Sequence, residues 1–150
     1  MGYIMDLRKI VGQRPLIMPC GTLIITDGND NFLLQKRVDD GKWALHGGSI
    51  ELNESAEDAM KREVKEELGL DITNYKLLNV YSGKEYYHIY PNKDEVSCID
   101  IVYVSIYDGS SITLQESEVS EVRWFNYHEL PEDMFLNNRK YIEDYMNSKK

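Results

Sequence analysis

The stretch GSIELNESAEDAMKREVKEELGL, from Gly48 to Leu70, decides the fold. Within it, Ser55 is followed three residues later by Asp58, a spacing that resembles a helix capping box. Apolar residues then recur at helical spacing until Gly69, a residue typical of a helix end. The pattern predicts one helix over residues 56–68. Its core-facing stripe consists of Ala56, Ala59, Met60, Val64 and Leu68.

The same helix carries three glutamates, Glu63, Glu66 and Glu67, at the edge of this stripe. At about 100° per residue they straddle the position of Ala56, next to the core-facing arc. Carboxylates at this spacing repel one another, and a bound cation relieves the repulsion. Oxygen-only ligands favour Mg²⁺, with Mn²⁺ as the alternative. The other interpretation is an ordinary solvated helix face.

The flanking sequence indicates strands on both sides of the helix. Residues 21–26 and 32–37 are rich in β-forming residues and are joined by the turn sequence DGND, which predicts a hairpin. Residues 97–107 have apolar side chains at odd and even positions, as expected of a strand covered on both faces. The order predicts a mixed sheet between helices. The remaining predicted elements are strands at 43–45, 75–81, 86–90 and 122–125 and a helix at 138–146.

Gly48, five residues, Glu54, seven residues and then the run REVKEELGL from Arg62 resemble the Nudix box of the Nudix hydrolase family, without a gap. At roughly one in fifteen per fixed position, a chance match anywhere in the chain is rarer than about one in ten million. The resemblance implies an α/β fold, the Nudix fold, in which a mixed β-sheet is sandwiched between helices (an α/β/α sandwich). Residues 1–150 are expected to form one such domain.

The resemblance also implies roles for the matched residues. Gly48 is expected to let its loop turn tightly, and a backbone carbonyl of Gly47 or Gly48 is expected to reach a metal. The metal ligands are expected to be Gly48, Glu63, Glu66 and Glu67, with Glu63 a ligand or a base. The structural residues of the box are expected to be Gly48, Glu54, Arg62 and Gly69. Because Arg62 lies four residues before Glu66, an ion pair is expected to orient that carboxylate.

Two positions depart from the family pattern, and one later glutamate extends it. His46 replaces a proline and Asn53 replaces a glycine, which affects loop shape and substrate preference. His46 is expected to be structural, with a phosphate contact as the alternative. Glu118 lies six residues before Trp124 and resembles a late-loop glutamate that serves many members as metal ligand or base. The catalytic residues are therefore expected to be Glu63, Glu67 and Glu118, with Glu116 and Glu121 as alternatives to Glu118.

Aromatic residues supply candidates for holding a substrate base. Trp43, Tyr81 and Tyr87 are assigned to substrate binding by stacking, with Tyr86 and Tyr90 as alternatives. The other interpretation of the whole group is packing in the core or in a hairpin.

Composition restricts the partners. The formal net charge of −9 and the pI near 4.8 disfavour extended nucleic-acid binding and anionic membranes. The chain has no secretory start and no run of about 18 apolar residues, so a cytoplasmic protein without membrane association is expected. Cys20 and Cys98 are expected to be free thiols, buried or partly buried.

The resemblance implies a Mg²⁺-dependent pyrophosphohydrolase. Its substrate is expected to be a small nucleotide-like molecule, namely a nucleoside diphosphate derivative such as ADP-ribose or a nucleotide sugar, or a modified nucleoside triphosphate. The alternative is a non-catalytic Nudix-fold sensor that binds a nucleotide and regulates a partner. A homodimer is an expectation from the family alone.

Overall fold

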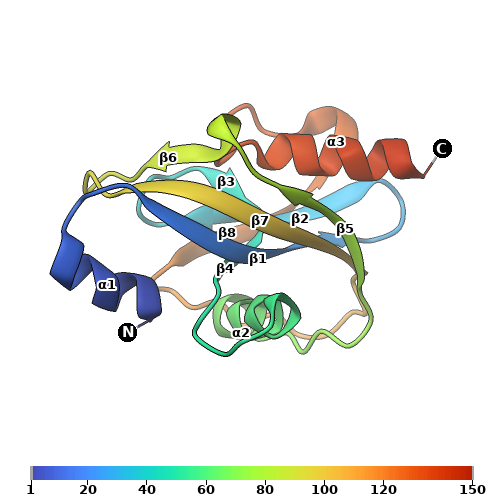
Figure 1. The fold of residues 1–150 in the computed structure, drawn as a ribbon. Coiled ribbons are helices and arrows are strands. Elements are labelled where there is room, and N and C mark those ends of the chain that lie inside the picture. The colour runs from blue at the N-terminus through green and yellow to red at the C-terminus, as the bar shows by residue number, and fades with distance from the viewer. Residues whose placement is uncertain (1, 150) are drawn as a thin grey trace.

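The computed structural model describes residues 2–149, which form a mixed β-sheet and three α-helices (Figure 1). Short 3₁₀ turns, η1 (Lys84–Tyr86) and η2 (Tyr127–Glu129), follow β5 and β8. The longer elements are, in chain order, α1 (Tyr3–Val11), β1 (Leu16–Thr26), β2 (Asn31–Arg37), β3 (Trp43–Ala44), β4 (His46–Ser49), α2 (Ala56–Leu68), β5 (Lys76–Tyr81), β6 (Tyr87–Ile89), β7 (Glu95–Ile106), β8 (Val119–Asn126) and α3 (Asn138–Ser148).

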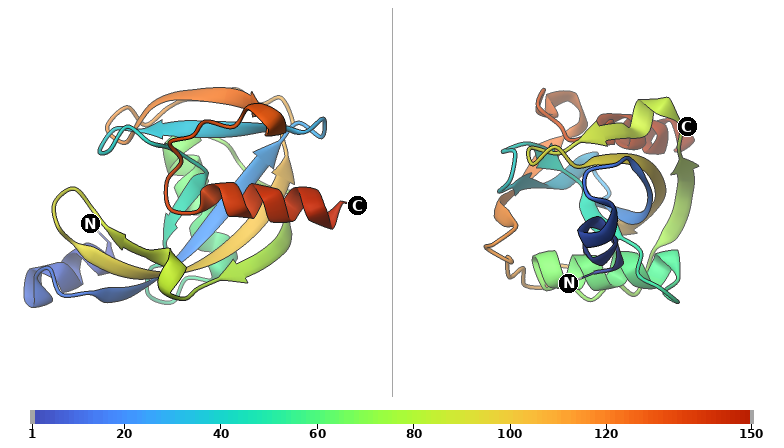
Figure 2. Two further views of the ribbon diagram at one scale, coloured as in Figure 1. Left: turned by 90° about the horizontal axis from the view of Figure 1, so that it is seen from above. Right: turned by 60° about the vertical axis from the view of Figure 1, so that its left-hand side comes forward.

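The sheet opens between β1 and β2. Strand β1 pairs in parallel with β7 along its whole length, and β5 and β6 pair antiparallel with β7. On the other side, β1 and β2 share only the pair Thr26↔Phe32 and then diverge, as the left view of Figure 2 shows. Beyond the hairpin, β4 replaces β2 beside β1, and β2 pairs with β3 and β8. Residues of both diverging strands line the cavity described below.

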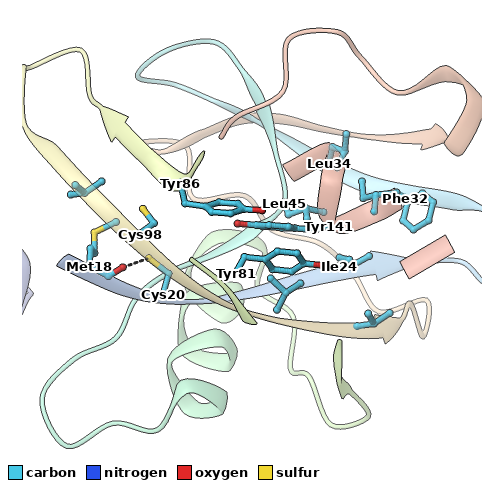
Figure 3. Packing of buried hydrophobic residues seen from close by; sticks show 14 residues of the cluster. Met18, Cys20, Ile24, Phe32, Leu34, Leu45, Tyr81, Tyr86, Cys98 and Tyr141 are labelled. Carbon is cyan, nitrogen blue, oxygen red and sulfur yellow. Dashed lines mark hydrogen bonds between the residues drawn. The ribbon is translucent and has the colours of Figure 1, made fainter. Parts of the chain in front are cut away.

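Two hydrophobic cores lie on the two faces of the sheet, under α2 and α3 respectively (Figure 1). In the apolar stripe of α2, Ala59, Met60, Val64 and Leu68 are fully buried, and Ala56 is half-buried. On the other face, Tyr141 of α3 packs on Tyr81 with their ring centroids 4.3 Å apart, among the residues drawn in Figure 3. This arrangement confirms the expected mixed sheet between helices.

Helix α2 begins and ends at the predicted residues. The Ser55 hydroxyl oxygen accepts a hydrogen bond from the Asp58 backbone N–H at 3.0 Å, as an N-cap does. At the other end, Gly69 adopts the left-handed conformation, with φ of 72°, that L side chains disfavour. Local sequence therefore defines this helix.

Helix α1 was not predicted. Its inward residues Ile4, Leu7 and Val11 have helical spacing, but only tertiary contacts hold the short segment in place. The buried Arg8 donates hydrogen bonds to the carbonyl oxygens of Gly12, Arg14 and Glu95. In the described residues, no helix is long and apolar enough to cross a membrane.

Candidate active site

A cavity of about 860 Å³ occupies the space between β1 and β2. Its wall near α2 is acidic and includes Glu63, Glu66, Glu67 and Glu118. A second part of the wall is mainly apolar, and we call it the apolar arm. It is formed by Met18, Cys20, Leu45, Tyr90, Val96, Cys98 and Phe135. The cavity therefore joins an acidic region to an apolar one.

Glu67 is the most deeply buried of the box glutamates, with 6% of its surface exposed. Its Oε1 accepts hydrogen bonds from the backbone N–H of Gly47 and from Nε2 of Gln35, both at 3.1 Å. Burial, together with the nearby charge of Glu63, raises the pKa of Glu67 to about 8. Burial also raises the pKa of Glu63, although Arg62 opposes the shift. The acidic wall holds negative charge that the protein only partly neutralises.

His46 holds Gln35 in place beneath Glu67. The His46 ring is fully buried, with Nε2 2.8 Å from the Leu33 carbonyl oxygen and Nδ1 2.9 Å from Nε2 of Gln35. Because a carbonyl only accepts, Nε2 carries the proton and Nδ1 accepts from the amide. Burial lowers the pKa of His46 to about 4, which keeps the ring neutral. The structural interpretation of His46 is thus confirmed, whereas the role of Gln35 was missed because nothing in its local sequence marks it.

Arg62 connects the box loop to the helix. Its guanidinium donates to both carboxylate oxygens of Glu54, at 2.8 and 2.9 Å, and to the Ser49 carbonyl oxygen at 3.1 Å. It also contacts Glu63 at 2.9 Å, whereas Glu66 lies 3.6 Å away. The expected ion pair between Arg62 and Glu66 is therefore present, and the shorter contacts of Arg62 are to Glu54 and Glu63. The hydrogen bonds from Arg62 lower the pKa of Glu54.

The expected reason for Gly48 is corrected by the structure. Gly48 lies in β4 and does not have a positive φ, so it does not serve a tight turn. A Cβ at this position would overlap the Glu63 carboxyl group. The glycine leaves room for the Glu63 carboxyl group, which a side chain at this position would have to displace.

Of the three late glutamates, only Glu118 is among the residues that line the cavity. It comes directly before β8, and its charge contributes to the raised pKa values of Glu63 and Glu67. Glu121 instead pairs with Arg123 at 3.2 Å. The placement favours Glu118 over Glu116 and Glu121 as a site residue.

The structure places none of the three assigned aromatic residues in the cavity. Tyr81 is buried in the core beneath α3, which corrects its assignment to substrate stacking. Trp43 packs on Phe125 with ring centroids 4.9 Å apart. Tyr87 is exposed on β6, because alternation along that segment turns Tyr86 inward instead. The aromatic residues that line the cavity are Tyr90, an alternative in the sequence, and Phe135, which was not considered.

Comparison with known proteins agrees with this architecture. The model of the NUDIX domain matches residues 19–145. The chain belongs to the Nudix hydrolase family. Over 84% of its length it is 32% identical to a protein of Pseudomonas putida (strain W619) named NAD-capped RNA hydrolase NudC. A Haemophilus influenzae (strain PittEE) protein of the same name is 31% identical over 79% of this chain. The alignments cover only 41% and 43% of those relatives.

Solved Nudix structures share the fold. The MutT NUDIX hydrolase from Burkholderia pseudomallei aligns with a TM-score of 0.71 and 25% identity, covering 87% of this chain and 98% of that one. The MutT protein from Methanosarcina mazei Go1 aligns with a TM-score of 0.73 and 22% identity, covering 92% and 98% of the two chains. The second likeness concerns the fold alone.

The Nudix box residues present a donor set that fits a hard divalent cation. Among residues 2–149, no three Asp, Glu, His or Cys side chains already surround one point. Glu63 is held by Arg62, and Glu67 is held by Gln35 and Gly47. All the acidic donors are carboxylate oxygens, which suit Mg²⁺ or Mn²⁺ better than zinc. Burial raises the pKa of Glu67 to about 8, and a cation bound beside it would favour its ionised form.

Replacing Gly47 by alanine should destabilise this Nudix domain by about 3 kcal/mol or more. Gly47 has φ of 147°, and a Cβ there would overlap the Gly21 carbonyl and lie 2.8 Å from Thr22 Cα. Chemical denaturation measures the loss. Gly28→Ala is the matched control, because Gly28 also has positive φ but has no atom within 4 Å of a new Cβ. Equal losses in the two variants would contradict the close approach.

Proposed function

We propose that this chain is a Mg²⁺-dependent pyrophosphohydrolase that cleaves the diphosphate linkage of a nucleoside diphosphate derivative. The observation that carries the proposal is one cavity of about 860 Å³, within the size range of small-molecule sites, whose wall includes Glu63, Glu66, Glu67 and Glu118 together with the apolar arm. Mn²⁺ is the alternative cation. The acidic wall would hold the cation, and the apolar arm would receive the remainder of the substrate.

The proposed ligands are Glu63, Glu66, Glu67 and a backbone carbonyl of the Gly47–Gly48 segment. When bound, the metal supplies charge neutralisation for the bridging phosphates and a lowered pKa for the attacking water. Gln35 and the Gly47 N–H orient one oxygen of Glu67 and leave Oε2 without a hydrogen bond from the described residues. Arg62 orients Glu63, and Glu118, which lines the same acidic wall, is the proposed base or additional ligand.

The charge of the chain bears on the size of the substrate. With a formal net charge of −9, the protein repels an extended polyanion at long range. This repulsion favours a small substrate over the body of an RNA. The relatives named NAD-capped RNA hydrolases nevertheless suggest a dinucleotide diphosphate as one test substrate. ADP-ribose, nucleotide sugars and oxidised nucleoside triphosphates complete the panel.

The proposal is tested by incubating the purified protein with this panel, with Mg²⁺, with Mn²⁺ and with a chelator. We expect metal-dependent cleavage of a diphosphate linkage into two phosphate-bearing products, identified by mass spectrometry. Cleavage that persists in chelator would contradict the metal requirement. Specific nucleotide binding without turnover of any panel member would instead favour the non-catalytic sensor.

The stability of the metal-free protein should fall by on the order of 2 kcal/mol between about pH 6 and pH 8. The pKa of Glu67 is about 8 in the folded state, above its ordinary value of 4.5. The folded state therefore binds the extra proton at low pH, and this stabilisation is lost as the pH rises through 8. The raised pKa values of Glu63 and Asp100 act in the same direction.

Thermal melting at both pH values, with and without Mg²⁺, measures this effect. The stabilisation by Mg²⁺ should be larger near pH 8, where the proton no longer competes for Glu67. Glu67→Gln serves as the control, because its metal-free form should lose less stability over the same range. A melting temperature that is independent of saturating Mg²⁺ would count against metal binding at these carboxylates.

A further inference from the structure

Asp100 lines the same cavity as Glu67, and its carboxylate is buried. It is not one of the residues of the acidic wall. It lies on β7 with 6% of its surface exposed, and its register partner on β1 is Cys20. Its Oδ1 accepts a hydrogen bond from the Thr22 hydroxyl at 2.5 Å, and its Oδ2 accepts one from the Tyr141 hydroxyl at 2.9 Å. Two hydroxyls from different elements thus fix the plane of the carboxylate.

No cation compensates this charge within the described part of the chain. None of the ion pairs formed by residues 2–149 includes Asp100. Burying an unpaired carboxylate is costly, so a fold that keeps one in a cavity wall presents it to whatever enters the cavity. Burial raises the pKa of Asp100 to about 6, which leaves the group mostly ionised at neutral pH.

An ionised carboxylate only accepts hydrogen bonds and has about four acceptor positions. Thr22 and Tyr141 occupy one position on each oxygen, so each oxygen keeps a free one. Two adjacent acceptors match a ligand edge with two adjacent N–H donors. The Watson–Crick edge of guanine has such a pair, at N1 and N2, whereas adenine places the acceptor N1 beside its amino group.

The surroundings suit a flat base. Tyr90 and Phe135 line the apolar arm, and both contact the His88 ring edge-on, with centroids 4.5 and 4.8 Å away. Cys20 and Cys98, free and buried, lie together at one end of the cluster in Figure 3. Aromatic and sulfur-bearing surfaces are favourable contacts for a base.

We propose that Asp100 is a specificity-determining residue that reads the base of the substrate and selects a guanine-type edge over adenine. The inference rests on the proposed function for the identity of the substrate as a nucleotide derivative. In this arrangement the base enters the apolar arm, its paired N–H donors reach the oxygens of Asp100, and the diphosphate extends to the acidic wall.

The first test compares kcat/KM for GDP-ribose and ADP-ribose, which differ only in the base. The wild-type protein should favour GDP-ribose by about tenfold or more, the value of a good bidentate contact. Asp100→Asn replaces one acceptor oxygen by an amide donor. The amide then matches adenine, which has the acceptor N1 beside a donor amino group, so the preference for GDP-ribose should disappear or invert. Asp39→Asn, which removes a carboxylate elsewhere in the cavity wall, should keep the wild-type preference. An unchanged ratio in folded Asp100→Asn would overturn the proposal.

The second test uses only the wild-type protein and does not depend on catalysis. Calorimetry should show that metal-free protein binds GMP about tenfold or more tightly than AMP or IMP, because IMP lacks the second donor. Equal binding of the three nucleotides would overturn the proposal even if Asp100→Asn fails to fold. Hydrolysis of the panel without base preference would leave the proposed function standing and refute base reading. Selective GMP binding without hydrolysis of any panel member would support base reading and contradict the proposed hydrolase activity.

Discussion

Replacing Glu67 by glutamine should lower kcat by about a hundredfold or more while the protein stays folded. The substitution keeps the size of the side chain but removes a charge from the proposed metal site, where a catalytic contact is worth several kcal/mol. The amide oxygen can still accept from Gln35 and Gly47, so the packing around the site is preserved. Steady-state kinetics with the best substrate of the panel measures the effect.

A matched control for this substitution lies on the same helix. Glu57 is in the first turn of α2 and accepts a hydrogen bond from the Tyr75 hydroxyl outside the cavity. Glu57→Gln should therefore change kcat by less than about twofold, since a surface carboxylate contributes little. Near-wild-type turnover by a folded Glu67→Gln protein would remove Glu67 from the catalytic site.

Glu118→Gln should lower kcat far more than Glu116→Gln or Glu121→Gln, by about a hundredfold if it acts as the base. Glu118 alone among these three lies on the cavity wall, and its charge contributes to the raised pKa values of Glu63 and Glu67. A group that acts only in the transition state changes kcat and kcat/KM together, and a full kinetic comparison of the three variants tests this.

Two outcomes would contradict this role. Equal and small losses in all three variants would place Glu118 among ordinary surface residues and leave Glu63 as the candidate base. A large loss only in Glu121→Gln would show that the six-residue spacing to Trp124 identified the wrong glutamate. In either case the box carboxylates would still form the proposed metal site.

The environments of the aromatic residues depend on tertiary packing and are not determined by local sequence. Tyr81 and Tyr90 both lie in segments that were predicted as strands, and their own sequence does not distinguish a core face from a cavity face. The structure buries Tyr81 against Tyr141 and places Tyr90 in the cavity. The difference depends on where α3 packs, and the position of α3 is a long-range property.

The sequence by itself determined the features that local physics controls. The cap at Ser55, the left-handed Gly69 and the apolar stripe between them define α2, and the helical period alone places the three box glutamates at the edge of that stripe. The family match adds the proposed chemistry.

Only the tertiary structure decided which distant residues meet these glutamates. Gln35 reaches Glu67 because β1 and β2 diverge after one residue pair, and Arg62 turns to Glu54 because the box loop folds back over the helix. Asp100 faces the cavity unpaired because α3 brings a tyrosine hydroxyl, not a cation, to its carboxylate. Such contacts join residues far apart in the chain, and their energies depend on burial and geometry that no local pattern contains.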